Sequence, residues 1–221
     1  MLEMSVLKED KEVEAIMKMS EQTIEVLGYT EHSRRHSSIV SKWAGEILRS
    51  LGCPEERVRL AEIAGYLHDI GNCINRQDHS QSGALLAYGI VRRLGLSAVH
   101  AAEIMAAIGN HDEQFGLPVS DISAALILAD KADVHKSRVK KAIDNVLRAN
   151  IHDRVNLAAE RSYLVTDCEQ KTITLHIEID TSICSVMDYF EIYFARMRLC
   201  RRAAEFLKCR FSLVINGNSL V

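Results

Sequence analysis

Apolar residues recur at helical spacing through most of the first 132 residues. In residues 9–27 they repeat every three or four positions, and the same period returns in residues 36–48, 54–69, 79–91, 97–109 and 121–132. This period places the apolar side chains of each segment on one face of a helix. The two prolines, Pro54 and Pro118, fall at segment starts or between segments. The sequence therefore predicts a mostly α fold, built on an all-helical bundle.

The pattern changes near Asn150. Residues 172–180 alternate strictly between apolar and polar, and with residues 162–166 they predict a β-hairpin that is covered on one face. Thr181 or Ser182 is expected to cap a long helix, and residues 211–215 alternate again as a third strand. We therefore predict a helical domain over residues 1–150 and a small α+β appendage with the order β-β-α-β over residues 151–221.

Composition and charge narrow the class of protein. The 221 residues are 48% hydrophobic with a formal net charge of -3, which does not favour a general nucleic-acid-binding surface. The basic run Arg196, Arg198, Arg201 and Arg202 is interpreted as a solvated helix face. The six cysteines form no CxxC pair, no apolar run approaches the roughly 20 residues of a membrane span, and the N-terminus lacks a signal core. We expect a cytoplasmic protein without membrane or nucleic-acid partners; a homodimer stays open.

An imidazole and a carboxylate stand side by side at the end of one predicted helix. The apolar run before them ends in His68 and Asp69, and Gly71 then stops the helix. Buried polar groups need partners, and a divalent cation would satisfy both side chains. Alone, the pair is equally compatible with a local helix cap beside a solvated histidine.

Further candidate ligands enter or end the apolar faces of other helices. They are His36, His79, His111 and Asp130. Helical bundles assemble metal sites from facing helices. Four histidines and two carboxylates exceed what one tetrahedral ion needs, and they suit two ions bridged by a carboxylate.

The order His36, His68-Asp69, Asp130 resembles the H...HD...D signature of the HD-domain superfamily of metal-dependent phosphohydrolases. The likeness rests on Arg35-His36-Ser37, the run from Ala61 to Gly71 and Leu128-Ala129-Asp130, and it covers roughly residues 30–140. The added His79 and His111 resemble the dinuclear branch, which includes enzymes that hydrolyse dinucleoside polyphosphates and other nucleotides. The resemblance thus implies an all-helical fold and hydrolysis of a phosphate ester or anhydride.

The resemblance also implies a role for each residue. His36, His68, Asp69 and Asp130 would hold a first ion, and Asp69, His79 and His111 a second, with Asp69 bridging. Asp69 and His68 would be the catalytic pair, because the ions activate water for attack on phosphorus. Histidine-rich ligation suits Fe, Mn, Zn or Ni, and Mg is also considered.

The expected partner is a phosphorylated small molecule, most simply a nucleotide, with Lys131 and Arg76 as candidate phosphate contacts. Asp133, three residues after Asp130, is expected either to pair with Lys136 or to orient a ligand histidine. His32 is either a further ligand or a solvated residue.

Three alternatives stay open from the sequence. Many relatives carry lysine where this chain has Asn72, so that charge must come from elsewhere or be missing. A non-catalytic protein that binds a metal or a nucleotide as a sensor is one rival to the enzyme. A single-metal nucleotidase, in which His79 and His111 bind the substrate phosphate, is the other.

Overall fold

The predicted helices are present in a computed structural model, which describes residues 2–29, 34–139 and 151–220. The N-terminal bundle comprises α1 (Met4–Glu9), α2 (Lys11–Val26), α3 (Arg34–Ser50), α4 (Glu55–Leu67), the 3-10 turn η1 (Ile70–Cys73), α5 (His79–Arg93), α6 (Ala98–Gly109), α7 (Asp121–Ala132) and the 3-10 turn η2 (Lys136–Arg138). The helix starts follow local chemistry. Pro54 precedes α4, while the side chains of Ser97 and Ser120 cap α6 and α7.

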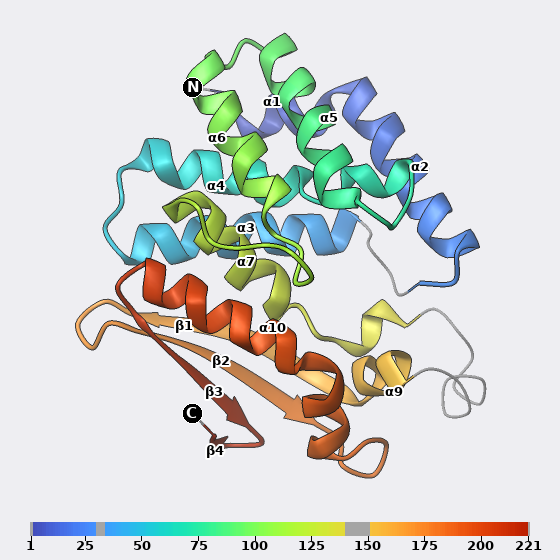
Figure 1. The fold of residues 1–221 in the computed structure, drawn as a ribbon, viewed down its shortest axis with the longest axis vertical. Helices are drawn as coiled ribbons and strands as arrows, with labels where there is room; N and C mark the ends of the chain where they lie inside the picture. Colours follow the sequence, from blue (N-terminus) through green and yellow to red (C-terminus); the bar gives the residue numbers. More distant parts are fainter. Residues whose placement is uncertain (1, 30–33, 140–150, 221) are drawn as a thin grey trace.

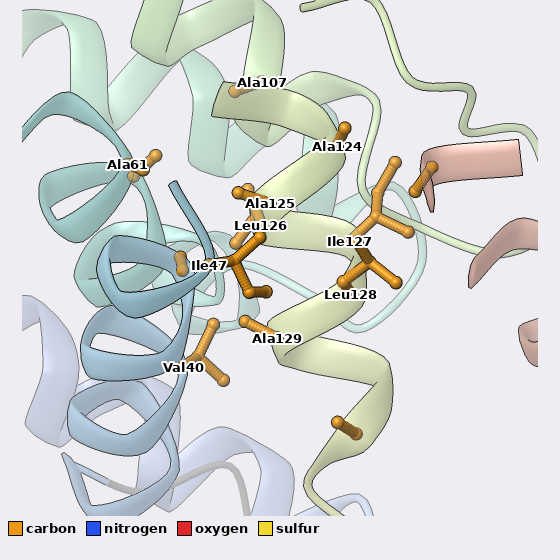
Figure 2. Close-up of a cluster of buried hydrophobic side chains, with 14 of the residues drawn as sticks. Val40, Ile47, Ala61, Ala107, Ala124, Ala125, Leu126, Ile127, Leu128 and Ala129 are labelled. Carbon is orange, nitrogen blue, oxygen red and sulfur yellow. The ribbon is translucent and has the colours of Figure 1, made fainter. Parts of the chain in front are cut away.

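Helix α7 runs through the middle of the molecule. Every residue from Ile122 to Ala132 is buried, because the helix contacts α3, α4 and α6 of the bundle as well as the long C-terminal helix. Figure 2 shows Leu126 and Ala129 facing α3, while Ile127 points to the opposite side. A helix that is apolar all round is expected at such a position. Asp130 therefore lies at the buried end of the most enclosed helix.

The C-terminal part forms a four-stranded sheet with two helices. Its elements are α9 (Ile151–Ala158), β1 (Ala159–Asp167), β2 (Thr172–Ile179), α10 (Val186–Phe206), β3 (Arg210–Ile215) and β4 (Asn218–Ser219). The strands lie in the order β1-β2-β3-β4, with β1 and β2 antiparallel, β2 and β3 parallel, and β3 and β4 antiparallel. The predicted hairpin and its covered face are confirmed, because Ile173, Leu175 and Ile177 are buried.

Helix α10 lies between the helical bundle and the sheet (Figure 1), and it contacts α7 on one side and β2 and β3 on the other. Its buried residues include Tyr189, Tyr193, Met197 and Cys200, which recur at helical spacing. The mostly α fold with a small C-terminal sheet is thus the predicted class. The proposed domain boundary at residue 150 lies outside the described residues and stays a prediction.

Three local predictions in this part need correction. Helix α10 begins after Ser185, not after Thr181 or Ser182, because Ser185 and Asp188 form a reciprocal capping box. Helix α9 was not anticipated from the sequence. The chain also continues past the predicted third strand, because Asn216 and Gly217 both adopt positive φ and form the tight turn that leads into β4.

Among the described residues, no helix has both the length and the apolar character that a membrane crossing requires.

Candidate metal centre

Five segments of the bundle bring the six predicted ligands together. His36 lies in the first turn of α3, His68 caps the end of α4 and Asp69 follows it. His79 begins α5, His111 follows α6, and Asp130 lies in the last turn of α7. All six side chains are buried. Residues that the sequence separates by up to 94 positions thus meet at the ends of their helices.

One oxygen of Asp69 faces a first group of ligands. Asp69 Oδ2 lies 3.6 Å from His36 Nε2 and 3.3 Å from His68 Nε2. Asp130 Oδ1 lies 3.2 Å and 3.5 Å from the same two nitrogens. Ligands bound at about 2.1 Å to one ion lie about 3.0–3.4 Å apart at octahedral or tetrahedral angles. The spacing of these donor atoms therefore suits one divalent cation.

The other oxygen of Asp69 faces a second group. Asp69 Oδ1 lies 3.5 Å from His79 Nε2, and the ring of His111 lies edge-on to the rings of both His68 and His79, at centroid distances of 5.0 Å and 5.1 Å. Donor atoms of His68, Asp69 and His111 also lie within 4.8 Å of one another. Asp69 is thus the residue that both groups share, as a bridging carboxylate would be.

All four histidines are anchored through the same ring nitrogen. Nδ1 lies 2.9 Å from Gly65 O in His68, 3.0 Å from Arg76 O in His79 and 2.6 Å from Ile108 O in His111. A carbonyl oxygen can only accept, so each Nδ1 carries a proton. His36 makes the equivalent contact to a carboxylate, described next. The Nε2 atoms of His36, His68 and His79 are the ring nitrogens that face the ligating carboxylates, which is the outer-shell arrangement that fixes metal-binding imidazoles.

Asp133 orients His36. Its Oδ2 lies 2.7 Å from His36 Nδ1, and Arg35 Nη2 donates to the same carboxylate at 3.1 Å. Burial alone would raise the pKa of Asp133, but the hydrogen bond to His36 and the charges of Arg138 and Arg35 hold that pKa below its ordinary value. Of the two roles expected for Asp133, orienting a ligand histidine is therefore the one that the geometry supports.

The buried carboxylates and histidines alter one another's protonation. Burial would lower the pKa of His68, but Asp69 and Asp130 raise it to about 10. For His111, burial followed by the charges of His68 and His79 lowers the pKa well below its ordinary value. For His79, burial and the charge of Arg76 lower the pKa as well. With no ion bound, one proton is thus concentrated on His68 while His79 and His111 are neutral.

Two glycines let these segments approach closely. A Cβ at Gly71 would lie 2.0 Å from His79 O and 2.5 Å from Gly83 N. The turn after His68 and Asp69 can therefore contact the start of α5, which carries His79. The Gly71 that ends the predicted helix also permits the second half of the centre to form.

Comparison with known proteins matches the same region. Residues 30–138, which contain all six candidate ligands, match the model of the HD domain. The chain belongs to the HD-domain superfamily. The predicted resemblance is confirmed, and superfamily membership together with the histidine–aspartate cluster supports a metal-dependent hydrolase.

Two related proteins place this HD domain among others. An uncharacterized protein of Methanocaldococcus jannaschii is 30% identical, and the match covers 60% of this chain and 59% of that protein's length, which is under two thirds of the relative. The crystal structure of a predicted HD superfamily hydrolase from an uncultured Thermotogales bacterium is 25% identical, with 59% of this chain and 73% of that chain covered and a TM-score of 0.45.

The departure at Asn72 has a structural counterpart in this HD domain. Asn72 Nδ2 donates to Asp69 Oδ1 at 3.0 Å and to Asp69 O at 2.9 Å. Arg76 Nη1 donates to Asn72 Oδ1 at 3.3 Å and lies 3.6 Å from Asp69 Oδ1. The cation that many relatives carry as lysine is thus replaced by Arg76, one helical turn later. His32, the other uncertain ligand, lies outside the described residues.

A buried chain of charges connects the HD domain to α10. Lys131 Nζ lies 2.7 Å from Asp130 Oδ2 and 2.6 Å from Glu113 Oε2. Arg196 Nε of α10 donates to Glu113 Oε1 at 3.1 Å. Burial would raise the pKa of Glu113, but Lys131 and Arg196 lower it far below its ordinary value. Lys131, predicted as a phosphate contact, is therefore engaged by two carboxylates and is only 5% exposed.

Arg196 and Glu113 were not recognised as site residues from the sequence. The interpretation of Arg196 as part of a solvated face is wrong, because its side chain is 19% exposed and pairs with Glu113. Glu113 follows His111 in the chain, and that adjacency is a usable signal. No local signal marks Arg196, because only the packing of α10 on α7 brings it to the centre.

A cavity of about 700 Å³ opens beside the second half of the centre. His79 and Asp112 lie in its wall, and Asp112 Oδ2 is 3.9 Å from His79 Nε2. Arg76 also lines it. Small-molecule sites commonly enclose about 300–1,000 Å³. A ligand of metabolite size can therefore enter next to Asp69, with a cation at hand.

Proposed function

We propose that this protein is a dinuclear metal phosphohydrolase that cleaves a phosphate ester or anhydride of a nucleotide. The observation that carries the proposal is the arrangement of Asp69. Its two oxygens face two separate sets of histidine nitrogens, at 3.3–3.6 Å for His36 and His68 and at 3.5 Å for His79. A structural ion pair needs one such set, whereas a two-ion centre needs both.

The donor set fits divalent metal. Imidazole nitrogens whose Nδ1 atoms are held by oxygen acceptors, together with two carboxylates, suit Fe, Mn, Zn or Ni. His36, His68, Asp69 and Asp130 would hold the first ion, and Asp69, His79 and His111 the second. When bound, the ions would supply a water of lowered pKa and would draw charge from the phosphoryl oxygens.

The remaining work falls to the protein's own side chains. Asn72 holds Asp69 in one orientation through two hydrogen bonds. Arg76 brings a guanidinium to the cavity wall beside Asp69, where it can hold a phosphoryl oxygen. Lys131 neutralises the outer oxygen of Asp130 and is a second candidate for phosphate contact.

A nucleotide is favoured by two considerations. The cavity volume of about 700 Å³ accommodates more than a phosphate group, and the sequence resembles the superfamily branch that hydrolyses nucleotides. Fold-level likeness alone does not select a substrate. The proposal therefore depends on a direct assay.

The test is hydrolysis by the purified protein reconstituted with Mn²⁺, Fe²⁺, Zn²⁺ or Ni²⁺. A panel of nucleoside mono-, di- and triphosphates and dinucleoside polyphosphates is assayed for phosphate release. We expect turnover that falls by more than about 100-fold in Asp69→Ala, with circular dichroism as the control for folding. Turnover that survives in Asp69→Ala would refute the metal mechanism, and nucleotide binding without turnover under all four metals would favour the sensor.

A further inference from the structure

Two exposed aromatic rings line the cavity beside the metal centre. They are Tyr29, from the end of α2, and Phe115, from the loop between α6 and α7. Phe115 is 79% exposed and Tyr29 is 53% exposed. Single exposed apolar residues are ordinary on a protein surface. Two rings that come from segments 86 residues apart and line one cavity ask for an explanation.

Phe115 is presented by a tightly closed turn. Gly116 N donates to Asp112 O at 2.7 Å, and Gln114 N donates to Asp112 Oδ1 at 2.9 Å. A Cβ at Gly116 would lie 2.3 Å from Asn110 O and 2.4 Å from Asp112 O, so the close approach needs glycine. The same turn starts at His111, a candidate ligand. The position of Phe115 is therefore set relative to the metal centre.

Tyr29 is placed by the end of α2. Gly28 has a φ of +78°, and its N–H donates to Glu25 O at 3.1 Å, while Tyr29 N donates to Ile24 O at 3.1 Å. This is the pattern of a Schellman motif, which fixes the first residues after a helix. Both rings thus stand on defined backbone.

The cavity has two chemically different parts. His79, Asp112 and Arg76 lie where the cavity meets the centre, and they supply metal-binding groups and a cation. The other lining residues include the two rings and the side-chain amides of Gln77, Gln81, Asn110 and Gln114. Aromatic rings stack on nucleobases, and amides hydrogen-bond the edges of bases. A ligand with a phosphate at one end and a planar heteroaromatic ring at the other matches this division.

We propose that this cavity is a nucleobase subsite, in which Phe115 and Tyr29 contact the faces of a base and the amides contact its edge. The subsite rests on the proposed function for the placement of the phosphate, but its affinity for a base does not require hydrolysis. The rings of Phe115 and Tyr29 are then the specificity-determining residues. Their stacking would accept any nucleobase, and the amides would discriminate among bases.

The test is the binding of adenosine, which carries a base and no phosphate, to the full-length protein as purified. Affinity is measured by ligand-observed NMR titration for wild type, Phe115→Ala, Tyr29→Ala and Phe115→Tyr. We expect each alanine variant to weaken adenosine binding by about 5- to 100-fold, and Phe115→Tyr to retain it. Phe194→Ala is the matched control, because Phe194 is 60% exposed on α10 and does not line the cavity.

Inorganic phosphate provides the second probe, and its affinity should be the same in wild type and in Phe115→Ala. The subsite is refuted if adenosine does not bind, or if Phe115→Ala and Phe194→Ala bind it equally well. Adenosine binding that depends on Phe115, in a protein that hydrolyses no nucleotide, would keep the subsite and reject the phosphohydrolase. Nucleotide hydrolysis without that dependence would do the reverse.

Discussion

His68 carries the proton that must leave when an ion binds. Its Nε2 faces both Asp69 and Asp130, and these carboxylates raise its pKa to about 10 despite burial. Because this pKa is raised above the ordinary value of 6.5, the shift stabilises the metal-free fold below pH 6.5, and that stabilisation is lost as the pH rises through 10. At neutral pH a metal ion and this proton compete for the same nitrogen.

Metal uptake at pH 7.5 should therefore release about one proton per chain. His79 and His111 add little, because their pKa values are lowered and they are already neutral. Calorimetric titration of the metal-free protein in two buffers of different ionisation enthalpy measures this release. The same apparent enthalpy in both buffers would show that His68 is not protonated before the ion binds.

Replacing Asp133 should weaken metal binding without removing a ligand. Asp133→Asn loses the charged acceptor that holds His36 Nδ1 at 2.7 Å, and loss of such an outer-shell contact lowers metal affinity by about 10- to 100-fold. Competition with a chromogenic chelator measures the affinity. Asp121→Asn makes the same chemical change at the other end of α7, where the partner is Arg57, and it should leave the affinity unchanged. Equal affinities in both variants would contradict the role of Asp133.

At the same scale, sequence reasoning found residues that announce themselves locally. His68-Asp69 at the end of an apolar run and Asp133 three residues after Asp130 are visible in the chain. The contact that each makes is visible only in the fold, as with the shared position of Asp69 between two groups of histidines.

The helices are held at the centre by close backbone contacts. A Cβ at Gly65 of α4 would lie 2.8 Å from Ser41 Cα and 2.9 Å from Ser41 N of α3. The carbonyl of Gly65 also anchors His68 Nδ1. The crossing of α3 and α4 thus sets the distance between His36 and His68.

Gly65→Ala should lower the free energy of unfolding by about 1–3 kcal/mol, because the backbone of α3 would have to move. Gly89→Ala is its counterpart inside α5, where nothing lies within 4 Å of the added Cβ, and it should raise that free energy by about 0.5–1 kcal/mol through helix propensity. Urea unfolding measures both. Equal effects of the two variants would show that the α3–α4 contact is looser than described.

The elements themselves followed from the sequence where periodicity was long and one-sided. The bundle helices and the alternating strand β2 were predicted, because an apolar period of three to four residues or of two leaves few alternatives. The start of α10 was misplaced, because Ser182 and Ser185 are both plausible caps and only Ser185 has Asp188 three residues later to complete a capping box.

In the whole molecule, α10 joins the C-terminal sheet to the metal centre. The ion pairs run from Arg196 to Glu113, Lys131 and Asp130, so charges of alternating sign lie between α10 and a candidate ligand. Sequence analysis could not predict this link, because it depends on which face of α10 meets α7.

Arg196→Met should lower the free energy of unfolding by about 3 kcal/mol, because it leaves the Glu113 carboxylate buried with one partner fewer. Adding Glu113→Gln should recover part of the loss, since no uncompensated charge then stays buried. Arg201→Met is the control on the same helix, where the arginine is 60% exposed, and it should change stability by less than about 0.5 kcal/mol. If Arg196→Met and Arg201→Met are equally stable in urea, the buried chain of charges does not hold α10.

The central claim is that Asp69 joins two ion sites, and metal content per chain tests it most directly. Elemental analysis of chelator-free protein should give near two ions per chain for wild type and about one for His79→Ala and for His111→Ala. His100→Ala, a histidine on α6 that pairs with Glu56 away from the centre, should retain both ions. One ion or fewer in wild type, or the same content in wild type and His79→Ala, would contradict the two-ion centre.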